Sequence, residues 1–288
     1  AGSGIIVSQK NDELLILTNH HVIDGAEELS VQFVNEKSYD AVVKGSSEKK
    51  DVAIISVKVK DIDNATMESI KIATIGDSNK LKVGNGIIAI GNALGYGQSV
   101  TTGVVSALNR TVTTDVSTTK MIQIDAAING GNSGGALINS AGEVVGINSV
   151  KYSSSGYSTS ASVEGMGFAI PISDVKELIE GLMNGEEVDD SDVILGIEGY
   201  IITESQSNAY NMPQGFYISK VTEGKGADKA GVEMGNIVTE IEGKKVDSVD
   251  VIKNILIDKK VGDKVKIKVS YIAKNQYKEK EVEVTLSK

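Results

Sequence analysis

One hydroxyl of the sequence stands where acyl-transfer chemistry would need it. Ser133 lies in the stretch NGGNSGGAL, with Gly130 and Gly131 before it and Gly134 and Gly135 after it. Glycine adopts backbone angles that are closed to other residues and lets a second backbone approach closely. Such a turn can aim NH groups at the place where an oxyanion forms, and those of Gly131 and Ser133 are the predicted donors. Glycine-rich turns with a serine also occur in loops without catalytic function, so its partners must be sought elsewhere.

A serine nucleophile needs a base, and the chain contains only two histidines. His20 and His21 stand next to each other, directly after the stretch ILTN. A single histidine at the end of a strand can equally be a surface or hydrogen-bonded structural residue. The sequence predicts no metal site here, because adjacent histidines point in different directions and neither HExxH nor a cysteine-histidine cluster occurs.

Asp51 is the carboxylate best placed to orient an imidazole. It directly precedes the apolar run 52–57, which should draw its backbone towards the core. A carboxylate in that position needs a partner, and an NH of histidine would satisfy it. Asp61, Asp63 and Asp77 lie in polar stretches and are typical of solvated loop residues. Aspartate is also common at strand boundaries, so a structural role for Asp51 stays open at this point.

Short strand-like runs must position these side chains. They occupy residues 5–8, 14–18, 29–34, 39–43, 52–57, 83–90, 98–108, 121–124, 136–138, 143–150 and 167–170. A succession of short strands with few helical patterns is typical of a β-barrel or sandwich, so the predicted fold is mainly β. The glycine-rich stretch 84–97 has neither GxGxxG spacing nor a following helical pattern, and we interpret it as β-turns, not as a nucleotide site.

A change of pattern divides the chain in two. The first helical pattern covers residues 173–183, and the acidic stretch 186–192 after it is predicted to be a linker. The predicted domains are therefore 1–185 and 193–288. The second has strand-like runs of its own and a helical pattern near 248–257, which predicts an α+β domain. Its lysine-rich end alternates charge with β-branched residues, so we favour a solvated hairpin face over a nucleic-acid site.

Composition limits the partners. The 288-residue chain has a net charge of −10 and a pI near 4.9, which disfavours nucleic acid or an anionic membrane surface as its main partner. Without cysteine it has no disulfide and no thiolate nucleophile. No run approaches the roughly 18 apolar residues of a membrane span, and no signal-peptide pattern opens the chain. We predict no cofactor.

The order histidine, Asp51, Ser133 is that of the chymotrypsin arrangement and differs from those of subtilisin and the α/β-hydrolases. Beyond this order, the sequence resembles the HtrA (Deg) family of serine proteases followed by a PDZ domain. The protease segments that match are GSGII at 2–6, ILTNHHV at 16–22, DVAI at 51–54, GNALGYGQ at 91–98, TGVVSAL at 102–108, the stretch 123–137, GIN at 146–148 and GFAIP at 167–171. The PDZ segments are ILGI at 194–197, GA at 226–227, AGV at 230–232, GNIV at 235–238, IEG at 241–243 and VGD at 261–263.

The resemblance implies a chymotrypsin-like fold of two six-stranded β-barrels with the site in the cleft between them. In the family motif the catalytic histidine directly precedes valine, which selects His21 over His20. His21 is then the base, Asp51 orients it, and Ser133 is the nucleophile of an acyl-enzyme mechanism. The implied oxyanion hole is formed by the NH groups of Gly131, Asn132 and Ser133.

The resemblance also implies two places of substrate binding. The implied S1 pocket involves Ala127, Ile128, Ser149 and Val150. None of them is a carboxylate, so we expect a small aliphatic residue, and not Lys or Arg, before the cleaved bond. In the PDZ domain, a peptide C-terminus would be held by the NH groups of Ile194, Leu195, Gly196 and Ile197. The peptide would then add as a strand in the groove between the strand that follows and the helix near 248–256.

Three positions that are proline in the family are Ala93, Gly130 and Ala136 here. Fewer prolines leave the unfolded chain looser. We therefore hypothesise an oxyanion loop that is disordered at rest and ordered by substrate or by a peptide at the PDZ domain. The family's trimer depends on a segment before the GSG motif that is absent from this sequence, so the resemblance leaves a homotrimer open for this chain.

The implied function is that of an ATP-independent endopeptidase of protein quality control. It would cleave unfolded or misfolded proteins outside the cytoplasm, with any membrane anchor in a segment before residue 1. A second interpretation is a latent protease that acts mainly as a PDZ-dependent peptide-binding or chaperone protein. A scaffold role, with a coincidental triad, is the third. Digestion of casein, compared between the parent and Ser133→Ala, distinguishes the first two.

Overall fold

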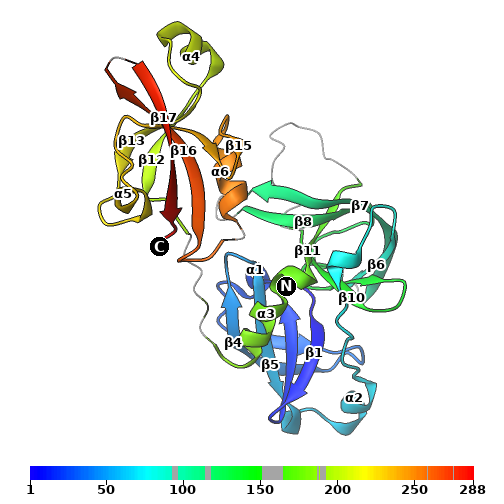
Figure 1. The fold of residues 1–288 in the computed structure, drawn as a ribbon. Helices are drawn as coiled ribbons and strands as arrows, with labels where there is room; N and C mark the ends of the chain where they lie inside the picture. The colour runs from blue at the N-terminus through cyan, green and yellow to red at the C-terminus, as the bar shows by residue number, and fades with distance from the viewer. Residues whose placement is uncertain are drawn as a thin grey trace. The chain divides into compact units, whose positions relative to one another are not determined.

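The structure is a computed structural model that describes residues 1–92, 97–113, 118–150, 165–186, 188, 193–257, 259–274 and 276–288. The chain divides into two compact units, Ala1–Asp190 and Ser191–Lys288 (Figure 1). Each unit has a hydrophobic core of its own. The division falls inside the stretch predicted to be a linker, and most of that stretch lies outside the described residues. Ala93, one of the three positions that are proline in the family, also lies outside them.

The first half of unit 1 is an antiparallel sheet with the strand order β1-β2-β5-β4-β3. Its strands are β1 (Ile5–Lys10), β2 (Glu13–Thr18), β3 (Leu29–Gln32), β4 (Ser38–Ser47) and β5 (Val52–Lys58). Both faces of β2 are covered, because Leu15 and Leu17 belong to one core cluster while Leu14 and Ile16 belong to another. Side chains alternate between the faces of a strand, which explains why β2 is apolar throughout.

This half has five strands in the described chain, one fewer than the resemblance implied. After β5 the chain forms η1 (Val59–Asp61) and α2 (Asn64–Ser69). It then meets β1 through one backbone bond, from Ala73 N to Ile6 O at 2.8 Å. At Gly76 it has already crossed to the second half, where its NH donates to Val144 O at 2.8 Å. A segment that crosses so soon does not form a sixth strand.

The second half of unit 1 closes into a six-stranded barrel with the order β10-β11-β8-β7-β6-β9. Its strands are β6 (Gly86–Gly91), β7 (Ser99–Thr113), β8 (Thr118–Ile124), β9 (Ala136–Asn139), β10 (Val144–Asn148) and β11 (Gly167–Pro171). Val105, Ile122 and Leu137 are buried in the core of this barrel. The short η2 (Ser78–Lys80) precedes β6. The described parts of the glycine-rich stretch 84–97 thus contribute strand and turn, as predicted, while residues 93–96 lie outside the described residues.

Helix α3 (Ile172–Met183) joins the two halves and confirms the helical pattern predicted at 173–183. Its apolar face, which includes Val175, Ile179 and Leu182, is buried in a cluster that also contains Ile54 of the first sheet and Ile147 of the barrel. A helix with an apolar stripe is stabilised mainly by such packing. The two halves that must supply one site are therefore held by a shared core.

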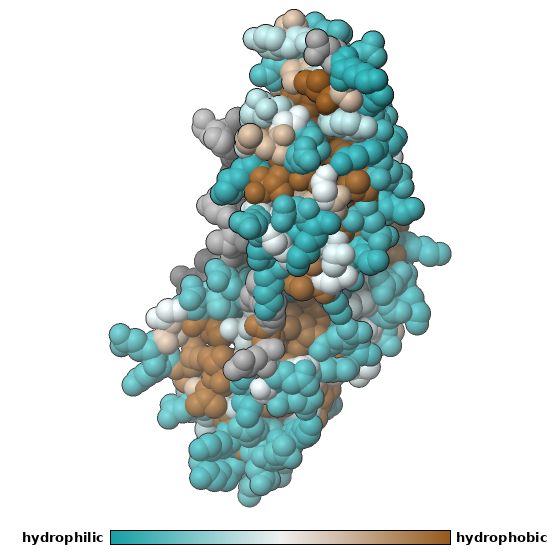
Figure 2. Space-filling view, turned by 60° about the vertical axis from the view of Figure 1, so that its left-hand side comes forward, coloured by the Kyte–Doolittle hydropathy of each residue, from teal (hydrophilic) through white to brown (hydrophobic). Residues whose placement is uncertain are grey.

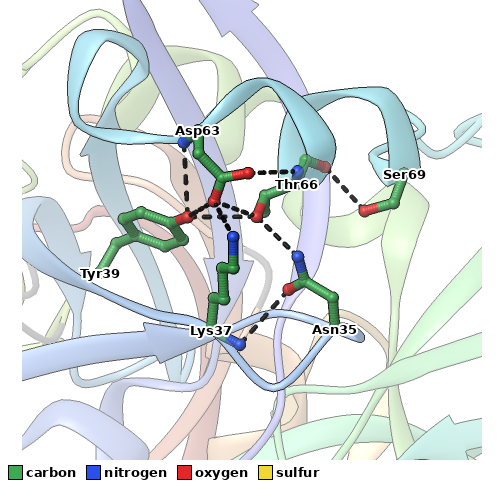
Figure 3. Close-up of polar contacts among 6 residues, drawn as sticks. All are labelled: Asn35, Lys37, Tyr39, Asp63, Thr66 and Ser69. Atoms are coloured by element: carbon green, nitrogen blue, oxygen red, sulfur yellow. Dashed lines mark hydrogen bonds and ion pairs between the residues drawn. The ribbon is translucent and has the colours of Figure 1, made fainter.

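Helix α2 begins at a polar cluster that the sequence analysis did not predict (Figure 3). Asp63 is its N-cap and accepts hydrogen bonds from Thr66 N at 3.1 Å and Thr66 Oγ1 at 2.8 Å, from Lys37 Nζ at 2.8 Å, and from the Tyr39 hydroxyl. These donors, with Lys37 the largest cause, hold the pKa of Asp63 well below its usual range. Asp63 is therefore a capping residue and not the solvated loop residue that we expected.

Unit 2 is an antiparallel sheet with the order β12-β13-β14-β16-β17, to which β15 is added beside β14. Its elements are β12 (Ile197–Ile202), α4 (Glu204–Tyr210), β13 (Gly215–Val221), α5 (Gly226–Lys229), β14 (Ile237–Ile241), β15 (Lys244–Lys245), α6 (Val249–Leu256), β16 (Lys264–Ala273) and β17 (Gln276–Thr285). The lysines of β16 form a solvated face, as predicted: Lys264 pairs with Glu283 at 2.7 Å and Lys268 with Glu240 at 2.7 Å. Hydrophilic residues cover most of the face shown in Figure 2, with smaller hydrophobic areas between them.

Candidate active site

The predicted base lies on a helical turn that the sequence analysis missed. Helix α1 (His20–Ile23) starts directly after β2, where we expected only the end of a strand. His21 presents two donors to one carboxylate: its backbone NH lies 3.0 Å from Asp51 Oδ1, and its Nδ1 lies 2.8 Å from Oδ1 and 2.9 Å from Oδ2. An ionised carboxylate only accepts hydrogen bonds, so Nδ1 carries the proton and Nε2 is left with a lone pair.

Asp51 is completely buried and is fixed from several sides. Besides His21, its carboxylate accepts a hydrogen bond from Ser149 Oγ at 3.3 Å, and its backbone carbonyl accepts one from Asn19 Nδ2 at 2.8 Å. Its φ of 53° lies in the left-handed region, which few residues other than glycine adopt and which aspartate adopts more readily than most. A buried carboxylate needs such partners. The turn before β5 is thus shaped to present this side chain to α1.

Ser133 lies on a turn that other residues could not form. Gly134 has a φ of +83°, and a Cβ there would come within 2.3 Å of both Ser3 O and Thr18 Oγ1. A Cβ on Gly135 would lie 2.1 Å from Ile90 O. Both glycines are therefore required by close backbone approach, as the sequence analysis proposed. By contrast, a Cβ on Gly130 would meet no atom within 4 Å.

The NH groups of this turn have different surroundings. Those of Gly131 and Ser133 make no hydrogen bond to any described residue, so they can receive an oxyanion. The NH of Asn132 donates to Asn129 O at 3.0 Å. This bond occupies its only backbone donor, and the expected contribution of Asn132 to the oxyanion hole is therefore not supported. The residue is instead buried beneath the turn.

The segment 149–150 connects Ser133 to the other two residues. Ser149 Oγ donates to Asp51, while the NH of Val150 donates to Ser133 Oγ at 3.0 Å. The predicted His21, Asp51 and Ser133 are thus brought to one place by two adjacent residues. Within the described part of the chain, Ser133 Oγ makes no hydrogen bond to His21. The hydroxyl accepts from Val150 and so keeps its own proton free to be donated to the imidazole.

Comparisons with known proteins identify the family of the chain. A family profile described as a trypsin-like peptidase domain matches residues 2–147, and one described as a PDZ domain matches residues 183–286. The chain belongs to the trypsin-like peptidase family. It is of the HtrA (Deg) type, in which the peptidase domain is followed by a PDZ domain.

Named relatives and solved structures support this membership. The chain is 37% identical over 279 residues to the serine protease Do-like HtrA of Lactobacillus helveticus, a match that covers 93% of this chain and 65% of that protein. With the serine protease Do-like HtrB of Bacillus subtilis (strain 168) it shares 38% identity over 285 residues, or 93% of this chain and 58% of that protein. The structure of the HtrA-type protease AlgW with a decapeptide matches with a TM-score of 0.72 and 29% identity, over 100% of this chain and 83% of that chain. The chain spans between 42% and 65% of the length of these and other curated relatives it matches.

The residues expected to line the S1 pocket of this peptidase lie on two segments. Ala127 is exposed, and its carbonyl accepts a hydrogen bond from Thr101 Oγ1 at 3.0 Å. Ile128 packs against the barrel core. Ser149 is completely buried, and its hydroxyl is bonded to Asp51, so it can contribute only its backbone. Val150 is half-buried and contacts the nucleophile. The four residues carry no charge.

The loop expected to bind a peptide C-terminus has NH groups available in the PDZ domain. The carbonyls of Leu195 and Gly196 accept hydrogen bonds from Ala227 N and Thr222 N, each at 2.9 Å. Across the described residues, the NH groups of Leu195 and Gly196 make no hydrogen bond, whereas that of Ile194 is bonded to a backbone oxygen at 2.8 Å. The following strand, β12, is the first in the sheet order and so offers an edge. This arrangement suits a bound carboxylate and an added strand.

Sequence reasoning missed several residues of the site. Ser3, Asn19 and Asn148 each tie segments around the triad together. They stand inside the matching motifs GSG, TNHHV and GIN, which was the available signal, but a motif match assigns no contact. The described residues contain no group of three or more His, Asp and Glu side chains that could bind a metal. Their helices are all too short or too polar to cross a bilayer.

Proposed function

We propose that this chain is an ATP-independent serine endopeptidase of protein quality control. One observation carries the proposal: the buried carboxylate of Asp51 accepts both the backbone NH and the Nδ1 proton of His21, beside a glycine turn that presents Ser133. A carboxylate so placed fixes the imidazole tautomer that can act as a base. Relatives named serine proteases support the same activity.

The proposed mechanism assigns one role to each group. His21 Nε2 takes the proton of Ser133 as its oxygen attacks a peptide carbonyl, and the NH groups of Gly131 and Ser133 stabilise the resulting oxyanion. His21 then protonates the leaving amine. In the second half, water replaces the amine and the acyl-enzyme is hydrolysed by the same steps in reverse order. Asp51 stabilises the imidazolium throughout, and no cofactor is needed.

We further propose that the substrates are unfolded or misfolded proteins outside the cytoplasm. Relatives named periplasmic proteases in Haemophilus influenzae and Escherichia coli support the location. The PDZ domain would hold peptide C-termini through the NH groups of Leu195 and Gly196 and an added strand on β12. At the peptidase site, the uncharged S1 residues favour a small aliphatic side chain before the cleaved bond over Lys or Arg.

A second candidate is a latent protease that acts mainly through peptide binding. Within the described residues Ser133 Oγ makes no hydrogen bond to His21, which favours this candidate because the nucleophile is not yet engaged with the base. We compare the parent and Ser133→Ala, each with and without a peptide that binds the PDZ domain. The proposed protease digests casein in the parent alone. If both proteins leave casein intact and suppress its aggregation equally, the chaperone function is correct instead.

A further inference from the structure

The segment Gly2-Ser3-Gly4 crosses the catalytic turn and is bonded to it at two points. The NH of Ser3 donates to Ser133 O at 2.7 Å, and its hydroxyl donates to Gly131 O at 2.7 Å. The same hydroxyl accepts the NH of Asn92 at 2.8 Å. Every hydrogen-bonding group of Ser3 is used, because its carbonyl accepts the hydroxyl of Thr18 at 2.7 Å.

These bonds fix alternate peptide groups of the turn. The peptide group between residues 131 and 132 is bonded at its oxygen to Ser3 and at its NH to Asn129 O. The group between 133 and 134 is bonded at its oxygen to Ser3 and at its NH to Asn148 O, 3.0 Å away. A peptide group is planar, so one that is bonded at both ends cannot rotate.

The two fixed peptide groups alternate with the two that carry the oxyanion donors. The NH of Gly131 belongs to the peptide group before the first fixed one, and the NH of Ser133 belongs to the group between them. Each donor is directed by the φ and ψ angles that link it to a fixed neighbour. Ser3 therefore sets the direction of both NH groups without touching a substrate.

The segment also ties the turn to the strand that leads to the base. Thr18, which holds the Ser3 carbonyl, is the last residue of β2 and lies three positions before His21. Both flanking glycines pass close to neighbouring side chains, so a Cβ at either position would force those side chains to shift. A Cβ on Gly2 would lie 2.6 Å from a methyl of Val22, and one on Gly4 would lie 2.6 Å from a methyl of Ile16.

We propose that Ser3 is a positioning residue of the oxyanion hole, an inference that rests on the proposed peptidase function. Its hydroxyl and NH hold the catalytic turn in the form in which the donors of Gly131 and Ser133 face the substrate carbonyl. A hydroxyl that only anchored the N-terminal segment would affect stability and leave the rate of the folded enzyme unchanged.

The test compares Ser3→Ala with Ser8→Ala. Ser8 lies on β1, half-buried, and its side chain makes no hydrogen bond within the described residues. Loss of one oxyanion donor costs about 10²–10³ in kcat, and we expect Ser3→Ala, which only loosens the donors, to lower kcat about ten-fold. KM should stay within about two-fold, because the uncharged ground state depends little on these donors.

The inhibition constant of a peptide boronic acid is a second measurement, which would stay unchanged if Ser3 had only a structural role. The tetrahedral adduct of this boronic acid on Ser133 places an oxygen at the oxyanion position, so the inhibition constant should rise by the same factor as kcat/KM falls. Binding of a peptide that forms no adduct should be unchanged. Rates are measured well below the unfolding temperature of each variant, and Ser8→Ala should match the parent in all of them.

The outcomes separate this inference from the proposed function. A parent that neither cleaves peptides nor forms the boronate adduct overturns both. An active parent with equal kcat and equal boronate affinity in Ser3→Ala overturns the role of Ser3 alone. If Ser3→Ala does not fold, Thr18→Val removes only the bond to the Ser3 carbonyl. A single neutral hydrogen bond corresponds to about a five-fold effect, so an unchanged kcat in this variant also overturns the inference.

Discussion

The bonds around Asp51 predict that Asp51→Asn loses activity while the fold is retained. An asparagine can place its amide oxygen where Oδ1 lies and keep the bond from the backbone NH of His21, which is 3.0 Å in the parent. Its NH2 group then lies where Oδ2 accepts Ser149 Oγ at 3.3 Å, and that hydroxyl can accept instead of donating. The buried position therefore stays satisfied, and the thermal unfolding temperature should change little.

The rate should change much more, for two reasons. The same NH2 group lies about where Oδ2 is 2.9 Å from His21 Nδ1, and this contact favours the tautomer with its proton on Nε2. That tautomer cannot take a proton from Ser133. The negative charge that stabilises the imidazolium is also lost. An Asp→Asn change in a serine protease triad costs about 10⁴ in kcat, equivalent to about 5 kcal/mol of barrier, and we expect about 10³- to 10⁴-fold here.

The assay is kcat on a chromogenic peptide at pH 7, with thermal unfolding measured on the same samples. Asp40→Asn, at an exposed position of β4, makes the same change of charge away from the site and should leave kcat unchanged. Ser149→Ala removes one donor and should cost about five-fold or less. Retention of kcat within ten-fold in folded Asp51→Asn would refute the tautomer argument.

Three further predictions concern the fold that holds the site. Gly134→Ala should prevent folding of the catalytic turn and abolish activity, because its Cβ would lie 2.3 Å from two oxygens. Gly142→Ala, with a φ of +80° and no atom within 4 Å of its Cβ, should cost only about 1–2 kcal/mol in chemical denaturation, and equal effects of the two changes would contradict the packing argument. Leu182→Ala should lower the free energy of unfolding by about 2–5 kcal/mol, because this fully buried side chain lies in the core shared by both halves of unit 1; a loss below 1 kcal/mol would contradict that placement. The folded pKa of Asp63 lies below its ordinary value of 3.8, so this carboxylate stabilises the fold above about pH 4, and the contribution is lost as the pH falls through the lower folded pKa. The unfolding temperature of the parent should therefore fall more steeply below pH 4 than that of Asp63→Asn, and parallel pH profiles would contradict the capping role.

Patterns that depend on burial were predictable from the sequence. The apolar runs at β2 and β5 and the stripe on α3 pack as their periodicities indicate. The four glycines within 130–135 indicated that another segment passes close to this backbone. Oxygen atoms of Ser3 and Thr18 do lie that close to Gly134. Each of these signals is local, because the residue types alone say which side must be buried or where a Cβ cannot fit.

Features set by distant partners were not predictable. The positive φ of Asp51 and the single turn of α1 depend on bonds between segments 30 residues apart in the chain. The bond of Ser3 to Gly131 crosses 128 positions, and no property of a lone serine indicates it. The bond between Asn132 and Asn129 is local, but the direction of an NH group in a glycine turn follows from backbone angles that residue types leave open.

The central claim is that Ser133 is a nucleophile activated by His21. Labelling with a fluorophosphonate, followed by peptide mapping, tests it most directly, because the reagent reports both the identity of the serine and the readiness of the turn. The account predicts one adduct, on Ser133, that is absent in Ser133→Ala and forms at least 10²-fold more slowly in His21→Ala, in line with the usual contribution of a general base. No adduct in the folded parent, or one on another serine, would contradict it.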